Sequence, residues 1–171
     1  MTVIYIIGAI ILLIVLLAFI VKTAFENKAE IVINKPKAEV FEFMKSLKNE
    51  DRWNIWAKMD PEMKQEFTGT DSSVGFIESW EGKKAGKGAK EIKKIVEGER
   101  IDIEMRFERP FKLTNNIYYT TTTVQGSKTK VVMVMYGNSP RPFNLVFPLM
   151  KSSLVRDFNK CLANLKAILE K

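Results

Sequence analysis

The sequence offers few side chains suited to acid–base chemistry, and Glu78 is the most suggestive of them. Side chains alternate along a strand, so Glu78 shares a predicted strand face with Val74, Phe76 and Trp80. A carboxylate on such an apolar face loses hydration, which raises its pKa toward the range of a general acid. Two alternatives remain open: a bulge or sheet edge that turns Glu78 to water, and an ordinary cross-strand ion pair.

The chain contains no histidine and a single cysteine, Cys161. These facts exclude Ser–His and Cys–His nucleophilic sites and remove the usual ligands of zinc and iron. Tyr118 or Tyr119 is then the best available partner for Glu78 in acid–base catalysis. Because the sequence also has no P-loop, dinucleotide-binding glycine motif, CxxC or HExxH, we expect no cofactor and no metal ion.

Two tryptophans, Trp53 and Trp56, lie three positions apart, ahead of the predicted sheet. An indole combines an apolar body with a polar tip, so the pair suits one wall of a pocket mouth. The alternative is that both plug the core. Cys161 falls on an apolar helical stripe, and we interpret it as packing rather than as a nucleophile.

The formal charge is +7, from 27 basic and 20 acidic residues. Six lysines crowd one segment around a predicted hairpin: Lys83, Lys84, Lys87, Lys90, Lys93 and Lys94. They suit either contact with anionic lipid headgroups or a simple solvated hairpin. Binding to single-stranded nucleic acid uses aromatic residues among the basic ones, and this segment has none, so we expect no nucleic acid partner.

The N-terminal segment Val3–Val21 carries no charged residue. At a rise of ~1.5 Å per residue it reaches about 28 Å, close to the thickness of a bilayer core. It lacks the charged leader and the A-x-A cleavage site of a secretory signal, and we expect a single-pass anchor in the cell membrane. Lysines follow the span, beginning with Lys22, and none precedes it, so the positive-inside rule places the domain in the cytoplasm. The expected division is an anchor over 1–24, a linker over 25–28 and a monomeric domain over 29–171.

The domain itself reads as α+β. Alternating polarity and glycine turns predict strands over residues 29–34, 62–69, 75–82, 88–98, 99–108, 112–125 and 128–138. A helix begins at Pro36 and carries an apolar stripe of Val40, Phe41, Met44 and Leu47. Residues 51–61 are predicted to form an irregular or short helical connection. Residues 139–148 form a loop or a broken helix start, and a long amphipathic helix follows them.

One strand shows its two faces clearly. Ile101, Ile103, Met105 and Phe107 alternate with charged residues, as in an antiparallel sheet with one buried side. The inward faces of 112–125 and 128–138 stay open, because both faces of each strand are mixed. The last helix is the element expected to cover the buried side of the sheet.

Six segments, in this order and spacing, resemble the START/polyketide-cyclase superfamily, whose helix-grip fold is shared with birch-pollen-allergen-like proteins. They are IVINKPKAEVFEFM (31–44), WNIWAKMDP (53–61), VGFIESWEG (74–82) with GKGAKEI (86–92), ERIDIEMRFERPF (99–111) and DFNKCLANLKAILE (157–170). The resemblance implies a curved antiparallel sheet of about seven strands wrapped on the C-terminal helix, with an apolar cavity between them. The residues expected to line that cavity are Trp53, Trp56, Phe76, Trp80, Ile103, Met105, Phe107, Tyr136, Met150, Leu154 and Phe158.

Three functions follow as hypotheses. The first is a membrane-tethered, non-enzymatic carrier for a hydrophobic small molecule or lipid. The second is an enzyme of the cyclase or dehydratase kind that uses Glu78 and a tyrosine in the same cavity. The third is an interaction module whose basic face contacts lipid or protein. The sequence does not identify the ligand.

Overall fold

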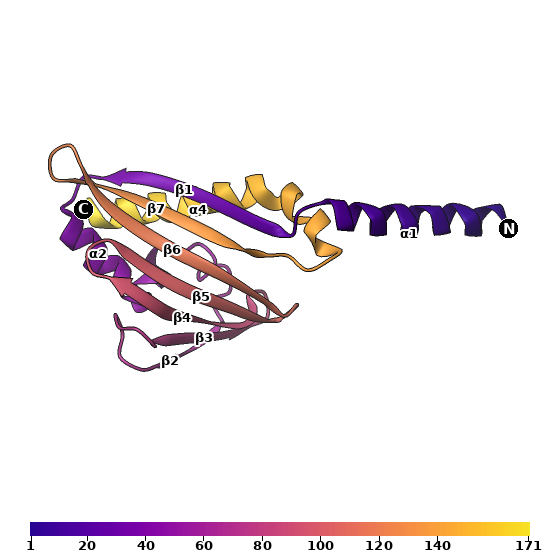
Figure 1. The fold of residues 1–171 in the computed structure, drawn as a ribbon. Coiled ribbons are helices and arrows are strands. Elements are labelled where there is room, and N and C mark those ends of the chain that lie inside the picture. The colour runs from indigo at the N-terminus through magenta and orange to yellow at the C-terminus, as the bar shows by residue number, and fades with distance from the viewer.

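The computed structural model describes residues 1–171 and shows a seven-stranded antiparallel sheet bent around a long C-terminal helix (Figure 1). The strands are β1 (Ala24–Ile33), β2 (Lys64–Thr68), β3 (Ile77–Gly82), β4 (Gly86–Val96), β5 (Arg100–Arg109), β6 (Leu113–Val124) and β7 (Lys128–Asn138). The helices are α1 (Thr2–Ile20), α2 (Lys37–Lys45), α3 (Leu47–Trp53), the 3-10 helix η1 (Phe143–Leu145) and α4 (Phe147–Leu169). This is the predicted α+β helix-grip arrangement.

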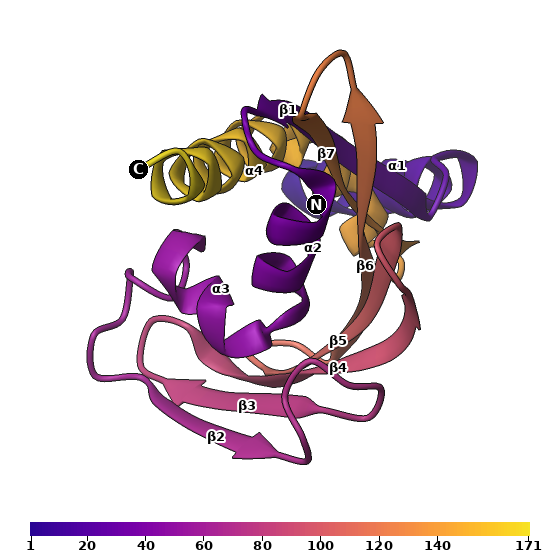
Figure 2. The ribbon, with the colours of Figure 1, turned by 90° about the vertical axis from the view of Figure 1, so that its left-hand side faces the viewer.

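The sheet has the order β1-β7-β6-β5-β4-β3-β2, so β1 and β2 are its edges. In β4 the register shifts between Lys87 and Gly88 and again between Ile92 and Lys94. Irregularities of this kind bend a strand and increase its twist. Figure 2 shows the resulting curve, with the sheet wrapped around α2, α3 and α4.

The pairing register settles the faces that the sequence left open. Tyr119 lies opposite Met133 on β7 and Ile101 on β5, and all three side chains are buried. Tyr118 therefore points to the outer face, where the guanidinium of Arg100 lies 3.8 Å from the centre of its ring. The inner face of β6 is the one that carries Asn115, Ile117 and Tyr119.

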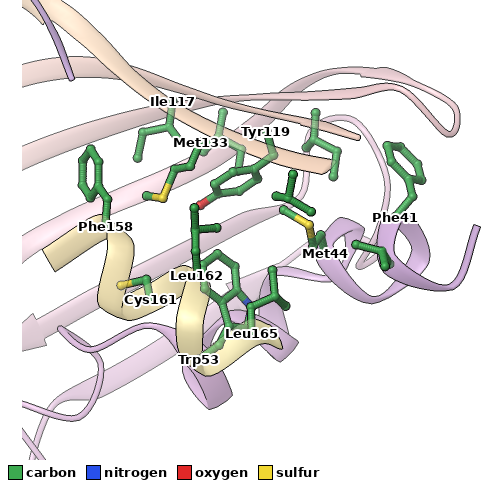
Figure 3. Packing of buried hydrophobic residues seen from close by; sticks show 14 of the residues in the cluster. Phe41, Met44, Trp53, Ile117, Tyr119, Met133, Phe158, Cys161, Leu162 and Leu165 are labelled. Carbon is green, nitrogen blue, oxygen red and sulfur yellow. The ribbon is translucent and has the colours of Figure 1, made fainter. Parts of the chain in front are cut away.

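The core lies toward the C-terminal end of α4, where α2 and α3 pack between that helix and the sheet. Figure 3 shows its close packing, with Trp53 set edge-on to Tyr119 at a centroid distance of 5.8 Å. Cys161 is fully buried within this cluster, as predicted. The members of the core that are labelled in Figure 3 are Phe41, Met44, Trp53, Ile117, Tyr119, Met133, Phe158, Cys161, Leu162 and Leu165.

The first strand begins at Ala24, five residues before its predicted start at Ala29, so the expected linker 25–28 is part of the sheet. Residues 24–28 pair with Val134–Asn138 of β7. Phe25 also stacks on Phe147, with ring centroids 4.1 Å apart. The backbone ladder and this aromatic contact outweigh the polar composition of the segment.

The predicted first helix is divided in two, because Ser46 has an extended backbone conformation between α2 and α3. Asp71 accepts a hydrogen bond from the Ser46 hydroxyl and another, at 3.1 Å, from the backbone N–H of Leu47. These bonds to Asp71 take the place of hydrogen bonds within a continuous helix, and the chain changes direction at Ser46. Leu47 remains in the core, but the break turns α3 so that Glu50 and Trp53 are buried beside it.

Helix α1 extends away from the rest of the molecule (Figure 1). It is long and apolar enough to cross a membrane, and only Ala18 among its residues is buried. Its C-terminal end is joined to the domain by side chains: Arg141 Nε and Asn144 Nδ2 each donate to the Ala18 carbonyl at 2.9 Å, and Asn144 Nδ2 also donates to the Val21 carbonyl. The helix therefore leaves the domain beside η1 and the start of α4.

Candidate ligand-binding cavity

A cavity of about 450 Å³ lies between the inner face of the sheet and the N-terminal half of α4. Its volume is within the usual range for small-molecule sites. Hydrophobic residues make up 17 of the 25 that line it, so its walls favour an apolar ligand. The cavity ends where α2 and α3 pack between α4 and the sheet and complete the core.

Most of the residues predicted to contact a ligand line this cavity. They are Trp56, Trp80, Met105, Phe107, Met150, Leu154 and Phe158. Trp53, Phe76 and Ile103 are instead packed in the core and contribute no cavity wall. The expectation for Tyr136 is wrong: it lies on the outer face, packed against Tyr118, because Met133 and Met135 occupy the inward positions of β7.

The mouth of the cavity is marked by the lining residues that are exposed to solvent. They come from the turn between β3 and β4, the loop between β5 and β6, and the first turn of α4: Lys84, Pro110, Phe111 and Met150, with Met59 beside them. Further exposed apolar side chains lie nearby, among them Leu149, which is 79% exposed, Phe143 and Val146. The ring of Phe143 contacts that of Phe111 at a centroid distance of 5.2 Å. This is the end of the domain from which α1 leaves (Figure 1).

A row of three polar residues and one methionine, called the polar row below, crosses the inner face of the sheet at the deep end of the cavity. The register aligns Asn115 of β6 with Met105 of β5, Met105 with Lys90 of β4, and Lys90 with Glu78 of β3. All four residues line the cavity. The neighbouring row toward the mouth contains Phe107 and Trp80, and the row on the other side enters the core.

Lys90 lies between two carboxylates at the centre of this polar region. Its Nζ is 3.0 Å from Glu78 Oε2 and 3.1 Å from Glu50 Oε2, with all three side chains at most 6% exposed. Asn54 donates to the second oxygen of Glu50, and Gln65 donates to that of Glu78. These acids do not form a metal-binding group, because the ammonium of Lys90 occupies the position between them.

Burial raises the pKa of Glu78 to about 7, the largest of several opposing effects. The positive charge of Lys90 lowers that pKa, while the negative charge of Glu50 raises it further. Burial also lowers the pKa of Lys90, but Glu50 and Glu78 outweigh this effect and hold it above its usual value. Two of the three interpretations of Glu78 therefore hold: it is a desolvated acid in an apolar cavity, and it forms a cross-strand ion pair. It is not turned to water, since its residue is only 2% exposed.

Sequence reasoning missed Lys90 and Glu50, the two residues that form a buried charge cluster with Glu78. Lys90 was grouped with the lysines of a solvated segment, yet it is buried, while its exposed neighbours Lys83 and Lys93 pair with surface glutamates. The available signal was its position two residues after Gly88 and two before Ile92, on the inward side of β4. Glu50 was overlooked in a short helix, although its spacing from Leu47 and Trp53 places it on the buried side.

The structure does not assemble the predicted pair of Glu78 with a tyrosine at the cavity wall. Tyr118 lies on the opposite face of the sheet. Tyr119 is on the inner face, but it is buried in the core and lines no part of the cavity. Burial holds the pKa of Tyr119 well above its usual value, and the negative charge of Glu50 raises that pKa further.

No protein-family model and no curated protein matches this chain. Solved structures do resemble it. Mll3558 from Rhizobium loti has a TM-score of 0.63 at 17% identity, with 84% of this chain and 96% of that one covered. CalU16 from Micromonospora echinospora has a TM-score of 0.58 at 14% identity, with 85% and 76% covered. Ara h 8.0201 has a TM-score of 0.54 at 12% identity, with 83% and 98% covered.

These similarities concern the domain that follows α1, and at such low identity they establish its fold and not its ligand. The order of strands, the curvature of the sheet and the long covering helix agree with the resemblance seen in the sequence. The domain therefore has a helix-grip fold, which it shares with these structures.

Proposed function

We propose that this protein is a membrane-tethered carrier that binds a hydrophobic small molecule or lipid in the cavity between the sheet and α4. Residues 3–21 hold the domain at a membrane, on its cytoplasmic side. Such molecules partition into bilayers, so a carrier anchored there works where its ligand is most concentrated.

The observation that supports this proposal best is the position of the mouth. The cavity opens at the end of the domain from which α1 leaves, and the exposed apolar side chains Phe111 and Phe143, whose rings are in contact, border it. Exposed apolar patches on soluble proteins commonly mark membrane or protein contacts. With α1 in a bilayer, the mouth faces the lipid, and an apolar ligand can enter without crossing water.

The experiment uses the full-length protein in phosphatidylcholine vesicles. The probe is an uncharged dansylated alkyl amide, and binding is measured as energy transfer from Trp56 and Trp80, which line the cavity. Leu154→Trp fills the cavity, so the variant should show no energy transfer that an unlabelled competitor can remove. Leu149→Trp is the matched control, because Leu149 is exposed on the same helix and lines no part of the cavity. If no unlabelled apolar compound displaces the probe, or if Leu154→Trp leaves the energy transfer unchanged, the carrier function is contradicted.

One observation favours a second candidate, an acid–base enzyme of the cyclase or dehydratase kind. Glu78 faces the cavity with a pKa of about 7, which is the range suited to proton transfer at neutral pH. In a dehydration, Glu78 accepts a proton from a substrate carbon and returns it to the departing hydroxyl, which leaves as water. Turnover that follows the ionisation of Glu78 and is lost in Glu78→Gln would support the enzyme over the carrier.

A further inference from the structure

The deep end of the cavity has an excess of negative charge. Glu50, Asp51 and Glu78 line it together with one buried cation, Lys90. Lys84 also lines the cavity, but it is exposed at the mouth. Counting each group as ionised, three negative charges oppose one positive charge at this end of the cavity.

Two of the donors at this end, Lys90 and Gln65, already have carboxylate partners. The ammonium of Lys90 contacts two carboxylates, and the Gln65 amide nitrogen lies within 2.9 Å of both Asp51 oxygens and 3.2 Å from Glu78 Oε1. A carboxylate oxygen can accept more than one hydrogen bond. The groups at this end that can still form hydrogen bonds with a ligand are therefore mainly acceptors.

Asn115 gives an independent sign that a polar group belongs here. It is 3% exposed, lines the cavity in the same row, and its carboxamide oxygen has no hydrogen-bond partner. Its cross-strand neighbour on β7 is Gly137. A side chain at that position would place its Cβ only 2.8 Å from the Asn115 oxygen, so the glycine leaves room for this oxygen. An unpaired polar atom in an apolar wall is unfavourable, and a hydrogen bond from a ligand would offset that cost.

Resting on the carrier function proposed above, we propose that the ligand is an amphiphile whose polar end is a neutral or cationic hydrogen-bond donor, such as an alcohol or an amine, seated against Glu78, Lys90 and Asn115. Its apolar part lies against Trp80 and Phe107 and extends toward the mouth. An anionic head group is disfavoured, because charge repulsion is strong where water is excluded.

The test compares three compounds of one chain length: hexadecanol, hexadecylamine and palmitate. Each displaces the dansylated amide from the full-length protein in phosphatidylcholine vesicles, at an alkaline pH at which palmitate is ionised. We expect palmitate to bind at least about tenfold more weakly than the alcohol or the amine, a difference of about 1.4 kcal/mol. Palmitate that binds as tightly as hexadecanol overturns the inference while leaving the carrier function standing. If no compound displaces the probe, the carrier function fails, and this inference fails with it.

Variants test the cause of the preference. Glu78→Gln removes one negative charge from the row and should narrow the gap between palmitate and hexadecanol. Asp51→Asn also removes one negative charge from this end of the cavity. Asp51 is only half-buried, and the amide oxygen of the new asparagine can still accept a hydrogen bond from Gln65. This variant therefore serves if Glu78→Gln does not fold. Glu108→Gln is the control, because this exposed residue at the end of β5 lies outside the cavity. A gap that is unchanged in folded Glu78→Gln and Asp51→Asn overturns the assignment of the preference to this row.

Discussion

Lys90 Nζ lies 3.0 Å from Glu78 Oε2, in a region where both side chains are almost completely buried. The two residues face each other across β3 and β4, so the sheet register itself brings them together. Glu50, from α3, contacts the same ammonium at 3.1 Å. A lysine held between two acids at the end of an apolar cavity links the stability of the domain to the chemistry of its ligand site.

The first prediction is that Lys90→Met destabilises the protein strongly. Removing the cation leaves Glu50 and Glu78 buried beside each other with no positive partner, and breaking a buried ion pair costs about 3–5 kcal/mol. Lys93→Met is the control: Lys93 is half exposed on the same strand and pairs with Glu91, so about 0–1 kcal/mol is expected. Urea unfolding of both variants measures the difference. If both variants lose equally little unfolding free energy, the ion pairs of Lys90 with Glu50 and Glu78 contribute little to stability.

The second prediction concerns pH. The folded-state pKa of Glu78 is raised from 4.5 to about 7, so between these values the folded protein binds a proton that the unfolded chain has released. The contribution of Glu78 to stability is therefore complete below pH 4.5 and is lost as the pH rises through about 7. Glu78→Gln should remove this slope. The quantity to measure is the difference in unfolding free energy between wild type and variant across the range. If the difference is constant with pH, the pKa of Glu78 is not raised.

The sequence predicted the strands well, because alternation and glycine turns are local signals. Ile101 and Ile103 alternate with Asp102 and Glu104, and β5 has that pattern in the structure. The inward faces of β6 and β7 were not predictable, since Tyr118 and Tyr119 are chemically equivalent and only pairing with neighbouring strands distinguishes them.

The polar part of the site was the least predictable, because it depends on contacts between distant segments. Lys90 resembles its exposed neighbours in sequence, and only its pairing with Glu78 and the approach of Glu50 from α3 explain its burial. The start of β1 was misplaced for a similar reason: pairing with β7 is not visible in the polar run that follows Phe25.

The third prediction concerns the anchor and uses the observed start of β1. Deleting residues 1–21 removes α1 and leaves the strand intact, so the truncated protein should be soluble, monomeric and cooperatively folded. Deleting residues 1–28 also removes Phe25 and half of the β1–β7 ladder, and it should lower the melting temperature markedly. Circular dichroism and size-exclusion chromatography compare the two. Aggregation of the 22–171 protein would indicate that α1 packs into the domain rather than into a membrane.

The fourth prediction concerns topology. Lysines follow the apolar span and none precedes it, which favours a cytoplasmic domain. A C-terminal fusion to green fluorescent protein should fluoresce in a bacterial host, and a C-terminal fusion to alkaline phosphatase should be inactive. Active phosphatase would place the domain on the other side of the membrane.

The last prediction separates a cavity from an ordinary core by enlarging two residues of the same strand face. Met105 lines the cavity, whereas Ile103, two positions earlier on β5, is 2% exposed and packed in the core. Overpacking a filled core costs about 1–3 kcal/mol or more, so Ile103→Trp should be destabilised by at least that amount. Met105→Trp places its ring in open space and should change stability little while abolishing binding of the uncharged dansylated probe. Chemical unfolding and probe binding are measured on the same preparations. If Met105→Trp is as unstable as Ile103→Trp, the space beside Met105 cannot accept an added ring, and the cavity is too small to hold an apolar ligand.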